Sequence, residues 1–360
     1  MKWSIQIGRL FGIPINLHVT FLLLLFYLLM QGGAAAAHVF IVLLLFGCVL
    51  VHELCHSLVA IRRGVNVHSI TLLPIGGVAQ MATAPEKPSD EIKIALAGPL
   101  ASFALAAAVY VAASLAGQAE SVLKLDVYRG TLLSRLFWAN VMLGALNLAP
   151  AFPMDGGRVV RGLLAMKIGM VSATRWAVTL GQAFAVLLYV AGAVDHRRLG
   201  FLILLAVFIY IGAANEEEDV EFRAKIADVP VSEAMMTRFE HLSPQMTIVQ
   251  SLEVLRHSSQ DEFPVLSDGK LAGMLSKNDV LSALGEMPRE AVVGEIMHTD
   301  FITSTPATPL GRVFRQMEQT GKDVVPVLDG GSVAGLISYD QIGRYYSLEP
   351  PAAEAKTERA

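Results

Sequence analysis

Six apolar stretches, each close to the length of a membrane-spanning helix, dominate the first 214 residues. A helix needs roughly 20 mostly apolar residues to cross the hydrocarbon core of a bilayer. With 54% hydrophobic and only 17% charged residues, the chain is also too apolar for a soluble protein of 360 residues. The sequence therefore predicts a polytopic α-helical membrane core of about six transmembrane helices. The stretches lie at about 15–31, 36–60, 92–116, 133–152, 173–194 and 199–214.

Lysine and arginine residues around these stretches predict how the core is oriented. Six spans place most of the basic connections on the same side as Lys2 and Arg9, which precede the first stretch. Because connections rich in Lys and Arg stay in the cytoplasm, we expect a multi-pass protein of the cytoplasmic membrane with both termini and the C-terminal domain in the cytoplasm. Arg197 and Arg198 oppose this orientation but are outnumbered. The supporting residues are Arg62, Arg63, Lys87, Lys93, Arg158, Arg161, Lys167 and Arg175.

The composition changes abruptly at Asn215, where an acidic run follows the last apolar stretch. The remaining chain contains two copies of one pattern, 62 residues apart, and each copy predicts a helix, a strand, a turn, a strand and a second helix. The matching pairs are Met235 and Met297, Pro264 and Pro326, Gly273 and Gly335, and Ser276 and Ser338. The predicted domains are a transmembrane core at 1–214, a linker at 215–230, an α/β repeat pair at 231–348 (about 231–285 and 293–348), and a disordered tail at 349–360.

Two histidines and a glutamate interrupt the second apolar stretch. His52, Glu53 and His56 form the pattern H-E-x-x-H, in which the histidines are four residues apart and share one face of a helix. Both imidazoles can then bind one Zn²⁺, while Glu53 is placed to take a proton from water on the metal. In a soluble protein, chance would explain such a pattern in a substantial share of cases. Within a membrane span, ionisable side chains are costly, which favours a buried functional site.

Asp155 is the predicted third metal ligand. Pro150 and Pro153 break the helix before it, and two glycines follow it, so this stretch is irregular at membrane depth. Irregular backbone is tolerated there only where protein buries it or where it lines a wet cavity. A catalytic zinc also needs a third protein ligand. The alternative is that Asp155 caps the N-terminus of the helix that follows it.

These two motifs together resemble those of the site-2 protease family of intramembrane metalloproteases, peptidase family M50. The family's second signature is close to N-x-x-P-x-P-x-x-D-G with small variations. Residues 147–156 resemble it through Asn147, Pro150, Asp155 and Gly156, with Pro153 one position after the second proline of the pattern. Gly98 and Ser102 resemble a small-residue motif on the family's third core span, although such spacing by itself only permits close helix packing. The segment 73–78 resembles the family's Gly-rich loop, which can present its backbone to an extended substrate. A simple turn between two extended segments explains that loop equally well.

The resemblance implies that the chain is an enzyme, a zinc metalloendopeptidase with one Zn²⁺ held by His52, His56 and Asp155. It further implies that Glu53 activates the zinc-bound water and that Asn147 supports the substrate or the transition state. The expected reaction is hydrolysis of a peptide bond within or near a transmembrane segment of a membrane-anchored regulatory protein. The lipid bilayer and this protein substrate are therefore the expected partners.

The C-terminal repeats resemble a tandem pair of cystathionine-β-synthase (CBS) domains, a module that senses adenine nucleotides. The resemblance implies that Ser276 and Asp279 bind ribose and that Ile302 and Thr303 contact adenine, with ATP, ADP or AMP as a regulatory ligand. The second repeat has Gln341 at the acidic position, so one nucleotide site is expected rather than two. A dimerisation module without a ligand is the alternative, and a homodimer through these domains is a further expectation.

Other functions fit the sequence less well. A net charge of −4 and the absence of a Lys/Arg-rich block argue against a nucleic-acid partner. A CBS-regulated transporter or channel would explain the spans and the tail, but it leaves the H-E-x-x-H pattern and the distant Asp155 without a role. A zinc-binding protein that does not cleave is a third alternative, because all the catalytic groups would be present in it too.

Overall fold

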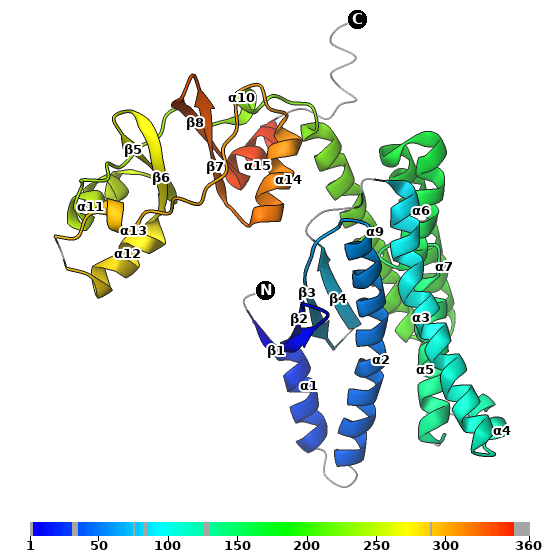
Figure 1. Ribbon diagram of the computed structural model, residues 1–360. Helices are drawn as coiled ribbons and strands as arrows, with labels where there is room; N and C mark the ends of the chain where they lie inside the picture. The colour runs from blue at the N-terminus through cyan, green and yellow to red at the C-terminus, as the bar shows by residue number, and fades with distance from the viewer. Residues whose placement is uncertain are drawn as a thin grey trace, which may run out of the picture. The chain divides into compact units, whose positions relative to one another are not determined.

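The computed structural model describes residues 3–30, 35–74, 76–81, 85, 87–124, 130–288 and 290–348. The chain forms two compact units, Met1–Glu221 and Phe222–Ala360, which are shown in Figure 1. The predicted disordered tail at 349–360 lies outside the described residues.

The first unit is mainly helical, but it supports only part of the predicted span count. Among the described residues, α2, α3 and α7 are long and apolar enough to cross a membrane, and α1 is a shorter apolar helix. The predicted stretch at 133–152 is helical only as far as Asn147, and α9 joins an apolar half to an acidic one. Six spans are therefore not confirmed. The helices are α1 (Val19–Met30), α2 (Ala35–Arg62), α3 (Pro88–Leu115), α4 (Ala119–Leu123), α5 (Leu132–Asn147), α6 (Asp155–Ile168), α7 (Met170–Val194), α8 (His196–Leu199) and α9 (Phe201–Ile226).

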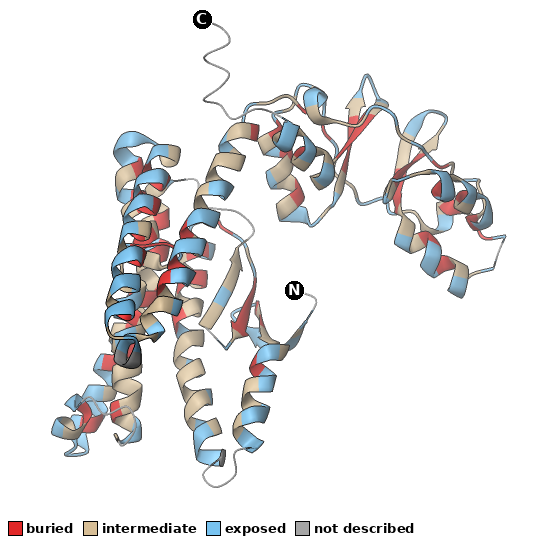
Figure 2. Ribbon diagram, turned by 180° about the vertical axis from the view of Figure 1, so that it is seen from behind, coloured by how far each residue is buried: buried red, intermediate tan, exposed pale blue. Residues whose placement is uncertain are grey.

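Large apolar side chains are exposed along these helices, and the pale blue ribbon of Figure 2 marks exposed residues on them. Leu187 on α7 is 68% exposed and Leu204 on α9 is 75% exposed. A soluble protein rarely exposes a continuous apolar surface of this kind, whereas lipid tails cover it without cost. The exposed surface of the first unit thus agrees with a membrane protein.

The first unit also contains a four-stranded sheet that the sequence did not predict. Its strands are β1 (Ser4–Leu10), β2 (Ile13–His18), β3 (Val67–Leu73) and β4 (Gly76–Met81), in that order. β1 and β2 are antiparallel, β2 and β3 are parallel, and β3 and β4 are antiparallel. The predicted helical core did not include this sheet, because the central pairing of Ile15 with Ile70 joins segments far apart in the chain. β4 is an edge strand of this sheet.

Helix α2 lies between this sheet and the helical bundle (Figure 1). Ile13, Ile15, Ile70 and Leu72 on the sheet are buried against apolar side chains of α2. On its other side α2 contacts α3, which in turn contacts α5 and α6. A side chain on α2 can therefore meet residues from the sheet, from α3 and from α6.

The proline-broken segment between α5 and α6 is anchored in the first unit by two residues. Ala151 and Phe152 are fully buried, and they pack against residues of α7 and α9. The peptide bond between Phe152 and Pro153 is cis. The centre of the irregular segment is thus covered by protein, whereas Leu148, Pro150 and Pro153 are exposed.

The second unit contains the predicted repeat. Helices α11 (Ile248–His257) and α14 (Leu310–Thr320) confirm the two predicted helices, and two antiparallel hairpins follow them with equivalent registers. Pro264 pairs with Met274 in the first hairpin, as Pro326 pairs with Leu336 in the second. The remaining elements are α10 (Val231–Ala234), β5 (Glu262–Ser267), β6 (Lys270–Ser276), α12 (Lys277–Glu286), α13 (Val293–Ile296), β7 (Val324–Asp329), β8 (Ser332–Ser338) and α15 (Tyr339–Leu348).

The two repeats interlock through the glycines that the sequence comparison had paired. A Cβ atom on Gly273 of the first repeat would lie 2.8 Å from the sulfur of Met297 in the second. In the reciprocal contact, a Cβ on Gly335 would lie 2.9 Å from the sulfur of Met235. The equivalent methionines therefore occupy the space that the equivalent glycines leave open, and the repeats form one folded unit.

The substitution Gly273→Ala tests this interlock. The added methyl group would also lie 3.0 Å from the His298 carbonyl oxygen, so we expect the second unit to lose about 1–3 kcal/mol of stability. Proteolysis of residues 231–348 in the full-length protein along a urea series measures this loss. The control is Gly285→Ala in α12, where nothing lies within 4 Å and where alanine should stabilise the helix by about 0.5–1 kcal/mol. Equal behaviour of the two variants would contradict the interlock.

Candidate metal centre

The predicted ligands His52, His56 and Asp155 converge on one point of the first unit. The His52 and His56 Nε2 atoms are 3.1 Å apart, and the Asp155 Oδ2 atom lies 3.3 Å from the first and 3.1 Å from the second. Both histidines are buried, at 2% and 6% exposed. Two imidazole nitrogens and one carboxylate oxygen within 4.8 Å of one another can hold a metal ion. This donor set fits zinc, which such a trio binds in catalytic sites.

Both histidine rings are oriented by helix α3. The His56 Nδ1 atom lies 2.6 Å from the Ile94 carbonyl oxygen, and the His52 Nδ1 atom lies 2.9 Å from Ser102 Oγ. A carbonyl oxygen only accepts, so His56 Nδ1 donates, and its Nε2 atom presents a lone pair to the cluster. Such contacts to the outer ring nitrogen are the usual support of metal-bound histidines.

Gly98 lies on α3 directly against the two histidines. A Cβ atom there would lie 2.6 Å from His52 Nε2 and closer still to His56 Nε2. No other residue type leaves room for both rings. The Gly98 and Ser102 pair therefore has a role beyond helix packing, since one residue makes the space and the other contacts a ligand.

Glu53 lies beside the ligands and against strand β4. A Cβ atom on Gly77 would come within 3.1 Å of the Glu53 Cδ atom and closer to Cγ. The backbone at the start of β4 thus rests on the Glu53 side chain. A carboxylate next to, but not within, the ligand cluster suits a proton acceptor.

Asp155 is the first residue of α6, and the cap of this helix is Met154, with no side-chain cap hydrogen bond. The alternative that Asp155 is the N-cap is therefore wrong. The following glycines allow the chain to turn back closely: a Cβ on Gly156 would overlap the carbonyl groups of residues 148 and 149, and one on Gly157 would lie 2.7 Å from the Phe152 nitrogen. The D-G-G sequence thus aims the carboxylate at α2.

The Asn147 side chain is not brought into this cluster by a hydrogen bond. It is half-buried in the last turn of α5, and its amide donates to the Leu143 carbonyl oxygen at 2.9 Å. Its predicted role in supporting the substrate stays a prediction.

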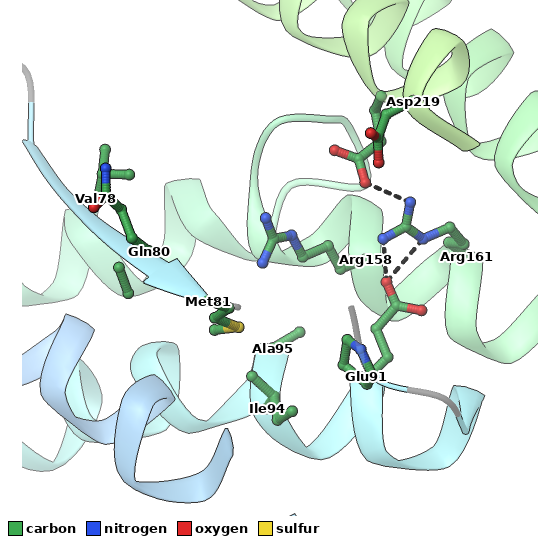
Figure 3. A pocket seen from close by; sticks show the side chains of 12 residues that line it. Val78, Gln80, Met81, Glu91, Ile94, Ala95, Arg158, Arg161 and Asp219 are labelled. Atoms are coloured by element: carbon green, nitrogen blue, oxygen red, sulfur yellow. Dashed lines mark hydrogen bonds and ion pairs between the residues drawn. The ribbon is translucent and has the colours of Figure 1, made fainter. Parts of the chain in front are cut away.

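A charged pocket that the sequence did not predict lies beside the metal centre (Figure 3). Arg161 of α6 bonds Glu91 of α3, with its Nε atom 2.8 Å from Glu91 Oε1, and Glu216 of α9 at 2.5 Å. In the sequence, Arg158 and Arg161 indicated only the orientation of the spans. The spacing of three residues between Asp155 and Arg158 was the one available signal that Arg158 lies next to a metal ligand on the helix surface.

Of the four residues predicted to bind a nucleotide in the second unit, Ser276 and Asp279 contact each other, whereas Ile302 and Thr303 have other surroundings. Ser276 and Asp279 form a capping box at the start of α12, and His298 Nε2 lies 3.2 Å from Asp279 Oδ2. Ile302 packs against the core of the second repeat, and Thr303 is exposed. Burial raises the pKa of Asp279, but hydrogen bonds from Ser276 and the charge of His298 outweigh it, so the pKa lies below its usual value.

A cavity of about 380 Å³ lies between the two repeats and includes Ser276 in its wall. The equivalent Ser338 and Gln341 of the second repeat line the same cavity. The Ser338 nitrogen donates to Gln341 Oε1 at 3.1 Å, as the Ser276 nitrogen donates to Asp279 Oδ2 at 3.1 Å. The glutamine therefore reproduces the shape of the first pair without its charge.

The substitution Gly98→Ala tests whether the three ligands hold metal as they lie here. Its methyl group would occupy the position of the two Nε2 atoms, so we expect zinc affinity to fall by about 10- to 100-fold. Zinc per chain, measured by mass spectrometry on purified protein, gives the result. Gly47→Ala on α2, with nothing within 4 Å, should keep its zinc. Full zinc occupancy in Gly98→Ala would rule out this geometry.

Sequence comparisons match both units to known families. The family described as peptidase family M50 matches residues 40–129 and 129–191, and the CBS domain matches residues 231–286 and 293–347. The first part of the M50 match contains His52 and His56, and the second contains Asp155.

Individual proteins resemble the chain over most of its length. A zinc metalloprotease of Methanocaldococcus jannaschii is 33% identical over 350 residues, which cover 97% of this chain and 97% of that protein. Rip3 of Mycobacterium tuberculosis is 30% identical over 331 residues, which cover 86% of this chain and 81% of Rip3. The solved structure of a site-2 protease from Methanocaldococcus jannaschii is 36% identical and covers 60% of this chain and 95% of its own, with a TM-score of 0.44.

Proposed function

Because this chain belongs to peptidase family M50 and is a zinc metalloprotease that carries a pair of CBS domains, we propose that it hydrolyses a peptide bond within or near a transmembrane segment of a membrane-anchored regulatory protein. The observation that carries this proposal is that His52, His56 and Asp155 converge beside Glu53. The two histidines and Glu53 belong to α2, which is long and apolar enough to span a membrane.

In the proposed reaction, His52, His56 and Asp155 hold the zinc ion and Glu53 is the general base. Zinc bound there would lower the pKa of a water molecule and polarise the scissile carbonyl group. Glu53 takes the proton from the attacking water and passes it to the leaving amine. Ser102 and the Ile94 carbonyl group keep the two imidazoles in the orientation that this requires, and Asn147 supports the substrate.

We place the substrate along β4. A transmembrane helix must unwind before its peptide bonds can be reached, and an extended segment can then pair with the open edge of a sheet. β4 is the edge strand next to Glu53, so a peptide paired with it would pass the metal centre. Six spans, with both termini and the CBS domains in the cytoplasm, would put this edge near the cytoplasmic face of the membrane.

The substitution Glu53→Gln tests the proposed chemistry. The amide keeps the shape of the side chain but cannot accept the proton, so we expect zinc content to be unchanged and cleavage of a model transmembrane substrate to fall by about 100-fold or more. Cleavage in proteoliposomes, followed by gel analysis of the fragments, measures this. The exposed residue Glu120 provides the control, and Glu120→Gln should cleave normally. Full activity of Glu53→Gln would refute the mechanism, and zinc binding without cleavage by the wild type would refute proteolysis of that substrate.

We further propose that adenine nucleotide bound by the CBS pair modulates proteolysis. The proposal is supported by the cavity between the repeats and by the ionised Asp279 close to it, a carboxylate that can accept hydrogen bonds from the hydroxyl groups of ribose. A ligand that binds two arrangements of the domain pair with different affinity would shift their populations.

The substitution Asp279→Asn tests nucleotide binding. Loss of the charged acceptor should weaken binding of ATP, ADP or AMP to the full-length protein by about 10-fold or more, measured by titration calorimetry. Asp268→Asn, in the exposed turn between β5 and β6, should bind as the wild type does. No heat from the wild type with millimolar adenine nucleotide would contradict the modulation and leave the proteolytic proposal untouched.

A further inference from the structure

The pocket of Figure 3 is lined by two elements, α3 and β4, that also contact residues of the metal centre. It has a volume of about 380 Å³, and its lining residues come from β4, α3, α6 and α9. Ile94 in the α3 wall also holds His56 through its carbonyl group, and β4 begins at the backbone that rests on Glu53. A peptide that lies along β4 next to Glu53 therefore passes over this pocket.

Two of the three acidic residues that line the pocket, Glu91 and Glu216, are matched by one arginine. Glu91 is 4% exposed and accepts hydrogen bonds from Arg161, and Glu216 accepts from the same guanidinium group. Both carboxylates are thus engaged with a cation of the protein itself. They contribute little free negative charge with which a basic ligand could pair.

Arg158 is the unmatched charge of this pocket. Its guanidinium group projects between α6 and β4, toward Gln80 (Figure 3), and among the residues that the structure describes it has no hydrogen-bond or ion-pair partner. Its Nε atom is buried without a partner. A half-buried cation without a counter-ion is unfavourable, and an anionic ligand relieves that cost.

Arg158 is also close to the reaction centre. It follows Asp155 by three residues on α6, which is one helical turn or about 4.5 Å along the axis. A group bound by Arg158 would therefore lie within the substrate cleft and not at a remote surface.

We propose that Arg158 binds a carboxylate of the peptide that occupies the β4 cleft during proteolysis. The planar guanidinium group donates two parallel hydrogen bonds that match a carboxylate. This inference rests on the proposed function, and it adds a binding residue that the H-E-x-x-H and D-G-G motifs do not contain.

Two groups of a substrate can supply that carboxylate. Hydrolysis adds water across the peptide bond, breaks the C–N bond, and leaves a new carboxylate on the N-terminal fragment and an amine on the other. The new carboxylate forms at the metal centre, where the ligand Asp155 is about one turn of α6 from Arg158. An aspartate or glutamate side chain of the substrate near the cleaved bond has the same chemistry.

Peptide binding to the zinc-loaded, full-length protein in lipid nanodiscs separates these sources. The probes are a fluorescent Ala/Leu/Ser peptide with a free C-terminal carboxylate, the same peptide as a carboxamide, and carboxamide peptides with Glu or Gln at each internal position. Each is titrated into the wild type, Arg158→Gln, Arg158→Lys and the control Arg9→Gln, which changes an exposed residue of β1. Zinc per chain must equal that of the wild type in each variant.

The measured quantity is the ratio of the affinities for the charged and the uncharged probe, compared between the wild type and each Arg158 variant. Zinc is present in every measurement, so its own contribution to carboxylate binding cancels in this comparison. We expect the preference for the carboxylate probe to fall by about 10-fold or more in Arg158→Gln, to be partly kept in Arg158→Lys, and to be unchanged in Arg9→Gln. Loss confined to the C-terminal probes identifies the product carboxylate, and loss confined to the Glu and Gln pair identifies an acidic side chain.

The proposal is overturned if Arg158→Gln keeps its zinc and the coupling is less than twofold both for the C-terminal probes and for the Glu and Gln probes. Because the measured quantity is peptide binding, the coupling does not require the peptides to be cleaved. An inactive wild type that still shows the coupling would refute the proposed proteolysis and leave carboxylate binding by Arg158 standing.

Discussion

The convergence of two imidazoles and one carboxylate inside an apolar helical unit is the constraint from which the rest of the first unit follows. Ionisable groups at membrane depth are unfavourable unless each polar atom has a partner. Here the outer nitrogens of His52 and His56 meet α3, and their inner nitrogens meet Asp155. The cluster thus requires both α2 and α6 to pack against α3, as they do.

Glycine makes that contact possible at each of the three approaches. Gly98 lets α3 reach the histidines, Gly77 lets β4 reach Glu53, and Gly156 lets α6 fold back on the proline-broken segment. Each site would be filled by a single methyl group. The residues that hold the reactive groups are therefore packed against glycines, which contribute by having no side chain. The hydrogen bonds of the site do not reveal this relation.

The parts of this architecture that the sequence predicted are those with local patterns. The spacing of His52 and His56 defines a shared helix face, and the prolines before Asp155 mark a broken helix, so both motifs could be recognised and the zinc metalloprotease family inferred. The sheet was missed because β2 pairs with β3 across the length of α1 and α2, and no local pattern encodes that pairing. Arg158 was missed for a related reason: its charge was assigned to the orientation of a connection, and only the fold places it between α6 and β4. The count of six spans stays a prediction, because α1 and α5 are shorter than a full membrane span.

The separation of the metal ligands along the chain has a consequence for biosynthesis. His56 and Asp155 are 99 residues apart, and ribosomes add about 5–20 residues per second. The H-E-x-x-H helix is thus made roughly 5–20 seconds before its third ligand. Throughout that interval the nascent helix carries two histidines and a glutamate without α6, and α3 is completed only partway through it. The newly made protein therefore cannot assemble a complete ligand set, or act on its neighbours in the membrane, until more than half of its membrane unit has been synthesised.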